Sequence, residues 1–185
     1  MSGPTPAQTV GPFLHIAMDW ADGPYAVGEG MPGAVWLHGR LLDGDGEPVA
    51  DGIIETWQAD PDGRFDHPDD PRGSVHTDGF RGFGRSCTDA DGQWEVLTLK
   101  PGSLPAEDGT TEAPHVDVSV FARGLLHRLV TRIYFDDETE RNAADPTLSA
   151  VDAERRPTLV AQRDDRGYWI DFHLQGDDET VFFDV

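Results

Sequence analysis

The chain has 185 residues, a length typical of one domain with its own hydrophobic core. Its 35 acidic and 14 basic side chains give a formal net charge of −21, which excludes nucleic acid and anionic bilayers as electrostatically attracted partners. The single cysteine, Cys87, excludes an intrachain disulfide and a cysteine-cluster zinc site. The sequence shows neither a secretory signal nor an apolar run long enough to span a membrane, so we expect a cytoplasmic protein.

Glycine and proline interrupt the sequence often, with 21 glycines and 14 prolines, and this excludes long helices over most of the chain. The segments between them are short and rich in β-branched and aromatic residues, which favours strands. Residues 34–42 and 52–59 are each followed by a turn that contains Asp and Gly, and we expect them to form a hairpin-like pair. Residues 83–87 and 93–99 flank another such turn and predict a second pair.

Residues 115–121 alternate strictly between the two faces of a strand. His115 and Asp117 share one face. The other face carries only valines, which predicts its burial in a core: Val116, Val118 and Val120.

The last third of the chain continues this pattern. Residues 129–135 and 168–174 predict further strands, and residues 180–185 predict a strand at a sheet edge. Only residues 136–144 and 148–155 contain enough helix formers for short helices. Short strands with turns about every 8 to 12 residues are typical of an all-β fold, here an antiparallel β-sandwich with short helices in its connections.

Common motifs for nucleotide and hydrolase chemistry are missing from the sequence, which has no phosphate-binding glycine loop, Gly-x-Ser-x-Gly elbow or His-Glu-x-x-His pair. His115 and Asp117 could bind a cation together, and His173 would complete the ligand set of a self-contained non-haem Fe(II) oxygenase. No Lys or Arg follows His173 to bind a 2-oxoglutarate carboxylate. A second alternative is a metal-free β-sandwich binding module, for which the Gly-Asp-Gly turns would suffice.

Seven short motifs between residues 5 and 137 point to a more specific assignment. In chain order they are Thr5-Pro6-x-Gln8-Thr9-x-Gly11-Pro12-Phe13, Glu55-x-Trp57-Gln58-Ala59-Asp60-x-x-Gly63, Thr88-x-Ala90-x-Gly92, Lys100-Pro101-Gly102, Ala113-Pro114-His115, Phe121-Ala122-Arg123-Gly124 and Arg132-x-Tyr134-Phe135-Asp136-Asp137. Together they resemble the motifs of the intradiol ring-cleavage dioxygenases, in the order in which that family has them. The resemblance implies a β-sandwich core and the opening of catechol rings with O2 at a ferric centre.

The resemblance also implies a metal site that this chain has lost. In the iron-bearing chains of the family, two tyrosinates and the two histidines of a His-x-His segment hold the metal. The matching positions here are Phe65, Leu104 and His115-x-Asp117, and neither Phe nor Leu can replace a phenolate oxygen as a ligand of Fe(III). We therefore expect Fe(III) to be bound by a partner and not by this chain, and whether the altered site binds anything else stays open.

The chain is most similar to the alpha subunits of the two-chain members of the family. This implies a homologous beta subunit as partner, in an αβ heteromer that we expect to form part of a larger assembly. The implied reaction converts 3,4-dihydroxybenzoate and O2 to 3-carboxy-cis,cis-muconate in a pocket completed by the alpha subunit. On this basis we expect residues 1–30 to form an N-terminal arm that contacts the partner, and residues 31–185 to form the β-sandwich domain.

Four residues are expected to contact the substrate. A dihydroxybenzoate is an anion, so a chain of charge −21 must place a local cation beside it. Arg123, at the end of the valine-rich strand, is the expected cation. The resemblance implies that Thr9, Gly11 and Pro12 of the arm contact the partner's pocket. In this segment glycine permits close backbone approach and proline stiffens the chain.

Overall fold

The computed structural model describes residues 3, 5–11, 13–106 and 109–184. Over these residues the chain is mostly strands with a few short helices, which confirms the β-rich prediction. The strands are β1 (Ala34–Leu42), β2 (Ile53–Trp57), β3 (Phe83–Cys87), β4 (Gln93–Leu99), β5 (Leu104–Pro105), β6 (Thr111–Glu112), β7 (Val116–Phe121), β8 (Leu129–Phe135), β9 (Val160–Arg163), β10 (Gly167–Trp169) and β11 (Phe172–His173). The helices are α1 (Leu14–Met18), α2 (Thr139–Ala144) and α3 (Pro146–Ala150), with 3-10 turns η1 (Asp136–Glu138) and η2 (Arg156–Leu159).

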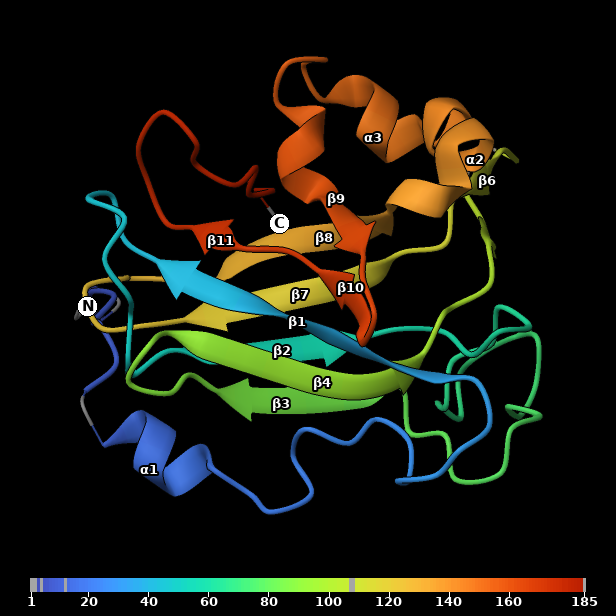
Figure 1. Cartoon of the computed structure of the whole chain (residues 1–185), viewed down its shortest axis with the longest axis horizontal. Helices are drawn as coiled ribbons and strands as arrows, with labels where there is room; N and C mark the ends of the chain where they lie inside the picture. The colour runs from blue at the N-terminus through green and yellow to red at the C-terminus, as the bar shows by residue number, and fades with distance from the viewer. Residues whose placement is uncertain (1–2, 4, 12, 107–108, 185) are drawn as a thin grey trace.

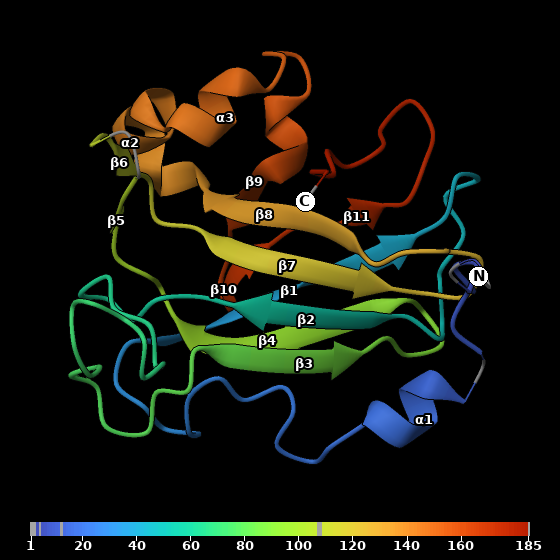
Figure 2. The ribbon, with the colours of Figure 1, turned by 180° about the vertical axis from the view of Figure 1, so that it is seen from behind.

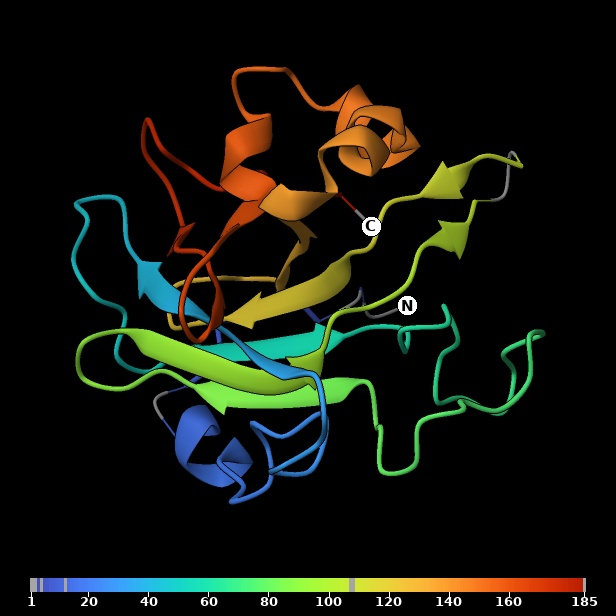
Figure 3. The same cartoon turned by 45° about the vertical axis from the view of Figure 1, so that its right-hand side comes forward.

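Nine strands form one nearly closed sheet in the order β11-β1-β10-β9-β8-β7-β2-β3, with β4 paired to β1. Figure 1 shows β1, β4, β10 and β11 in front of β2, β7 and β8, and Figure 2 shows the same two layers from behind. The backbone N–H of Glu95 in β4 donates to Ser86 Oγ at 3.0 Å, which links β4 to β3 at one end of the path. β5 and β6 form a separate small hairpin, yellow-green in Figure 3.

The strand positions agree with the sequence, but the predicted hairpin pairs are wrong. β1 pairs antiparallel with β4, and β2 pairs antiparallel with β3. The Asp-Gly turns do reverse the chain locally: the backbone N–H of Asp43 donates to the carbonyl of Glu47 at 2.9 Å. The chain then crosses to the other layer, so that consecutive strands separate after the turn (Figure 1).

The sheet is also not antiparallel throughout. β1 pairs in parallel with β10 and β11, and β8 pairs in parallel with β9. The chain reaches β9 from β8 through η1, α2, α3 and η2, and a connection of this length permits parallel pairing, which a tight turn does not.

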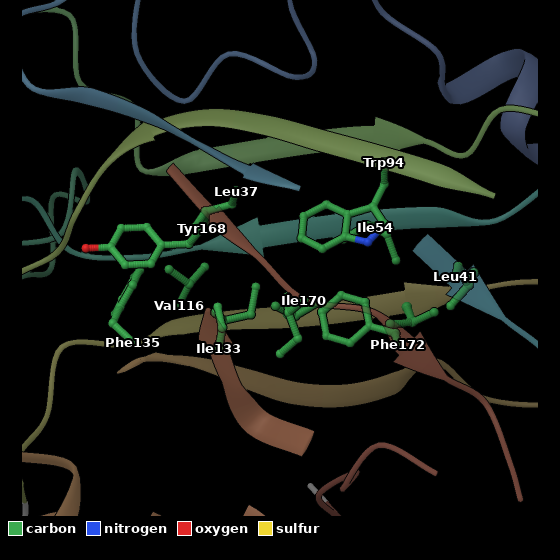
Figure 4. Close-up of a cluster of buried hydrophobic side chains, with 13 residues drawn as sticks. Leu37, Leu41, Ile54, Trp94, Val116, Ile133, Phe135, Tyr168, Ile170 and Phe172 are labelled. Atoms are coloured by element: carbon green, nitrogen blue, oxygen red, sulfur yellow. The ribbon is translucent and has the colours of Figure 1, made fainter. Parts of the chain in front are cut away.

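The main core lies between the two layers and contains the predicted face of β7. Val116, Val118 and Val120 are buried there, as the alternation predicts. Trp94 stacks on Phe172 with ring centroids 5.2 Å apart. Figure 4 shows these two rings among the aliphatic side chains that fill the space between the layers.

The ends of several elements differ from the sequence expectations. The strand expected over residues 168–174 is divided into β10 and β11, and the described part of 180–185 forms only an isolated bridge, between Phe183 and Val130. Helix α3 begins two residues early because the carboxylate of Asp145 accepts from the Leu148 backbone N–H at 2.7 Å and Pro146 fits the first turn. No helix among the described residues is long and apolar enough to cross a membrane.

The segment expected to form an arm contains one unpredicted helix and one well-packed stretch. Helix α1 lies below β3 (Figure 1), and the Cys87 thiol lies 3.5 Å from the His15 carbonyl oxygen. Further along, Ala26 and Val27 are buried against the sheet. The boundary between residues 30 and 31 stays a prediction.

Candidate functional site

Arg123 lies in a tight turn between β7 and β8. The backbone N–H of Leu125 donates to the carbonyl of Ala122 at 3.3 Å, which closes the turn around Arg123 and Gly124. Gly124 has φ of +92°, a conformation that glycine adopts without the strain other residues would meet. The Ala-Arg-Gly sequence thus projects the arginine from a corner at the end of a core strand.

The side chain of Arg123 is 61% exposed, and its Nε forms an ion pair with Oδ2 of Asp51, whose side chain is only 15% exposed. Among the described residues, Asp51 is the ion-pair partner of Arg123. A guanidinium held at Nε still offers its outer edge to a planar anion, because its donors are arranged as a fork that matches a carboxylate.

The N-terminal segment meets the same turn. The backbone N–H of Gly124 donates to Thr9 Oγ1 at 2.7 Å, across 115 positions of sequence. The structure therefore brings together Thr9 and Arg123, two of the four residues predicted for the substrate pocket. Gly11 is exposed, and a Cβ atom at this position would meet nothing within 4 Å, so packing within this chain does not require glycine there. Pro12 lies outside the described residues.

Large apolar side chains are exposed in this region. Phe13 is 76% exposed and Ile16 and Leu126 are also mostly exposed. Phe13 and Ile16 belong to the N-terminal segment, and Leu126 belongs to the connection that carries Arg123. Large exposed apolar side chains on the two segments that carry Thr9 and Arg123 are suited to contact with another molecule.

Two of the positions that match tyrosinate ligands are filled by apolar side chains. Phe65 stacks on Trp57 with ring centroids 5.6 Å apart and lines an open pocket of about 450 Å³. Leu104 is buried in β5. Neither residue offers an oxygen atom, so this part of the chain does not fit a ferric ion.

The histidine and the aspartate of His115-x-Asp117 are engaged by other groups. His115 is buried, more deeply than its place on the polar face predicts, with Nδ1 2.8 Å from the Ala113 carbonyl and Nε2 3.5 Å from Glu112. Asp117 lies directly opposite Arg132 in the β7–β8 ladder, and Arg132 Nε donates to its carboxylate at 2.9 Å.

Arg132 also approaches Glu112, with Nη1 3.4 Å from Oε1. Burial lowers the pKa of Arg132, but the nearby carboxylates of Asp117 and Glu112 and the Tyr134 hydroxyl outweigh burial and hold that pKa above its ordinary value. The guanidinium therefore supplies, in this structure, the positive charge that the carboxylates require. A metal ion would have to displace it.

The alternative of a self-contained Fe(II) oxygenase is wrong. It requires His173 beside His115 and Asp117, but His173 lies in β11, at the opposite end of the sheet path from β7 and β2. Among the described residues, no group of three or more histidine, cysteine, aspartate or glutamate side chains could hold a metal ion. The sequence spacing of His115, Asp117 and His173 is compatible with a metal-binding triad, but spacing does not indicate which strands become neighbours.

Sequence reasoning missed Asp51, Glu112 and Arg132. Asp51 is 72 positions from Arg123, and only the β2–β7 pairing brings the two together. The charges of Asp117 and Arg132 are 15 positions apart in two predicted strands. Only a prediction of the register between β7 and β8 could have placed Asp117 opposite Arg132 from the sequence.

Comparison with known proteins gives the same assignment. Residues 21–176 match the family model described as Dioxygenase. The chain is similar to the protocatechuate 3,4-dioxygenase alpha chain of Burkholderia cepacia, with 43% identity over 202 aligned residues, which cover 98% of this chain and 97% of that relative. It is also similar to the protocatechuate 3,4-dioxygenase beta chain of Burkholderia cepacia, with 31% identity, covering 94% of this chain and 77% of that relative.

The fold is shared with solved structures of dioxygenases. Catechol 1,2-dioxygenase from Pseudomonas arvilla C-1 superimposes with a TM-score of 0.58 and 22% identity, covering 82% of this chain and 55% of that chain. This likeness concerns the fold alone. The family match over most of the sequence and the 43% identity over nearly its full length show that this chain belongs to the intradiol dioxygenase family, as a close homologue of protocatechuate 3,4-dioxygenase alpha chains.

Proposed function

We propose that this chain is the alpha subunit of an intradiol dioxygenase that cleaves 3,4-dihydroxybenzoate with O2 to 3-carboxy-cis,cis-muconate. Its partner in this proposal is a homologous beta subunit, in an αβ heteromer that belongs to a larger assembly. The existence of separately named alpha and beta chains among its relatives supports this pairing. The same relatives are enzymes, which favours this function over a metal-free binding module. A cytoplasmic location stays a prediction.

The observation that carries the proposal is the environment of Arg123. In a chain of charge −21, this arginine side chain is 61% exposed and pairs with Asp51 through Nε. Thr9 binds the turn that bears it. These features support a role for Arg123 and Thr9 in binding the carboxylate of the substrate, and the proposal keeps Gly11 and Pro12 as further substrate contacts.

The second part of the proposal assigns Fe(III) to the beta subunit. The residues of this chain at the matching positions do not fit the ion, because Phe65 and Leu104 lack donors and Arg132 neutralises Asp117. The exposed side chains of Phe13 and Ile16 support contact between the N-terminal segment and the partner, since burial of such side chains in an interface is favourable.

The test is replacement of Arg123 by alanine in the complete αβ complex. We expect kcat/KM for 3,4-dihydroxybenzoate to fall about 10- to 150-fold, as for the loss of a charge-assisted hydrogen bond. Catechol lacks the carboxylate and should lose much less. Arg128→Ala is the matched control, because it removes the same charge from an exposed position of the same connection. An equal loss for both substrates, or dissociation of the complex, would show that Arg123 is structural.

A further inference from the structure

Asp51 is held in place by its neighbours on the chain. It immediately precedes Gly52, whose backbone N–H donates to Thr88 Oγ1 at 2.8 Å and whose carbonyl accepts from the Thr88 N–H at 3.0 Å. The same hydroxyl donates to the Val49 carbonyl at 2.6 Å. A Cβ atom on Gly52 would lie 2.4 Å from a methyl group of Leu41, so this segment is tightly packed. Asp51 therefore extends from a rigid base.

The sheet register explains why Asp51 meets Arg123. Ile53 of β2 lies opposite Phe121 of β7 in an antiparallel pair. Asp51 comes two residues before Ile53, and Arg123 comes two residues after Phe121. Because the strands are antiparallel, both residues lie just past the same end of the pair. Both residues lie in turns just outside the two strands, and their side chains meet there in an ion pair.

Arginine has a long side chain, and fixing it for ligand binding costs conformational entropy. Asp51 contacts the Nε atom of Arg123, and the arginine side chain stays 61% exposed. Thr9 acts on a different part of the turn, since it binds the backbone N–H of Gly124. One contact thus fixes the backbone that carries the arginine, and the other fixes the guanidinium.

We propose that Asp51 is a positioning residue for substrate recognition, which holds the Arg123 guanidinium with its outer edge free for the carboxylate of the aromatic substrate. The inference rests on the proposed function of Arg123. It assigns to Asp51 no contact with the substrate. Without Asp51, the arginine keeps its charge but loses its orientation, so binding should weaken while the chemical step stays unchanged.

Asp51 also has an electrostatic effect of the opposite sign, and the direction of the change in KM separates the two effects. A carboxylate beside the binding cation also repels an anionic substrate, and exposed ion pairs contribute little to stability. If repulsion dominated, removal of Asp51 would lower KM. If positioning dominates, as we propose, removal raises KM, and an uncharged acceptor at the same place restores part of the binding.

The experiment compares Asp51→Ala and Asp51→Asn in the complete αβ complex, with 3,4-dihydroxybenzoate and catechol as substrates. For Asp51→Ala we expect KM for 3,4-dihydroxybenzoate to rise about three- to tenfold, with kcat unchanged and catechol unaffected. Asp51→Asn should lose less, because its amide oxygen can still accept from Arg123 Nε. The control Asp45→Ala removes an exposed carboxylate from the same connection and should change neither constant.

A double-variant cycle completes the design. In the Arg123→Ala background, Asp51→Ala should have no further effect, since the side chain it positions is gone. The inference is overturned if KM for 3,4-dihydroxybenzoate is unchanged or falls, if catechol is affected equally, or if the two substitutions are additive. When Arg123→Ala lowers the preference for the carboxylated substrate and Asp51→Ala does not, only this inference fails. When Arg123→Ala leaves that preference unchanged, the proposed function fails and this inference fails with it.

Discussion

Replacement of Arg132 by leucine tests the account of the altered metal site. Arg132 is 20% exposed, and it lies between the carboxylates of Asp117 and Glu112. Leucine would leave both carboxylates without their cation. Breaking a buried ion pair costs about 3 to 5 kcal/mol, and we expect about 3 kcal/mol here because Asp117 keeps partial contact with water.

For a chain of 185 residues, such a loss lowers Tm by about 6 to 12 °C. The assay is thermal and urea denaturation, with Arg166→Leu as control. Arg166 forms an ion pair with Glu95 in which both side chains are about half exposed, so its loss should cost less than about 1 kcal/mol.

A double variant separates the charge effect from general damage. Asp117→Asn should recover part of the stability lost in Arg132→Leu, because a neutral amide does not need a cation. The two substitutions should therefore be non-additive by about 1 to 3 kcal/mol. Additive effects, or an Arg132→Leu variant as stable as Arg166→Leu, would refute the assignment of Arg132 as the cation of this site.

Two further predictions concern the stability of the fold. Hydrogen bonds from Arg72, and then from backbone N–H groups, outweigh burial and hold the pKa of Asp70 well below its ordinary value, so the ionised carboxylate stabilises the folded state. Asp70→Asn should lower the urea midpoint at pH 7. The difference in urea midpoint between the variant and the wild type should narrow as the pH falls below about 4, where an unfolded aspartate takes up its proton. A difference in midpoint that stays constant down to pH 3 would contradict this prediction. Phe172→Ala should cost about 3 to 5 kcal/mol, because it removes a fully buried ring stacked on Trp94, and a loss below about 1 kcal/mol would show that the core collapses around the gap.

Local sequence patterns predicted the positions of the strands, but they did not predict which strands pair with one another. The valine alternation of 115–121 identifies a core strand because burial imposes a period of two on its side chains. The Asp-Gly turns indicate chain reversal equally well. They do not indicate whether the next strand stays in the same layer, which depends on how the two layers pack, and β1 therefore pairs with β4 rather than β2.

For the candidate site, the sequence named individual residues but not the contacts between segments that are distant in the chain. Motif resemblance predicts Thr9 and Arg123 as substrate contacts, which stays a prediction, and the contact between Thr9 and Gly124 is compatible with that grouping. Asp51 carries no local signal, since an aspartate before a glycine is a common turn residue. Helix α1 escaped prediction because its five residues are too few for an amphipathic pattern to show.

The iron content of this chain, measured alone and in complex with the beta subunit, tests the division of roles most directly. The account predicts an iron-poor, colourless chain when it is purified by itself, because neither Phe65 nor Leu104 can form a tyrosinate–iron bond. It predicts one iron ion for each αβ pair in the complex. Two iron ions per pair, or a coloured preparation of this chain alone that contains stoichiometric iron, would contradict it.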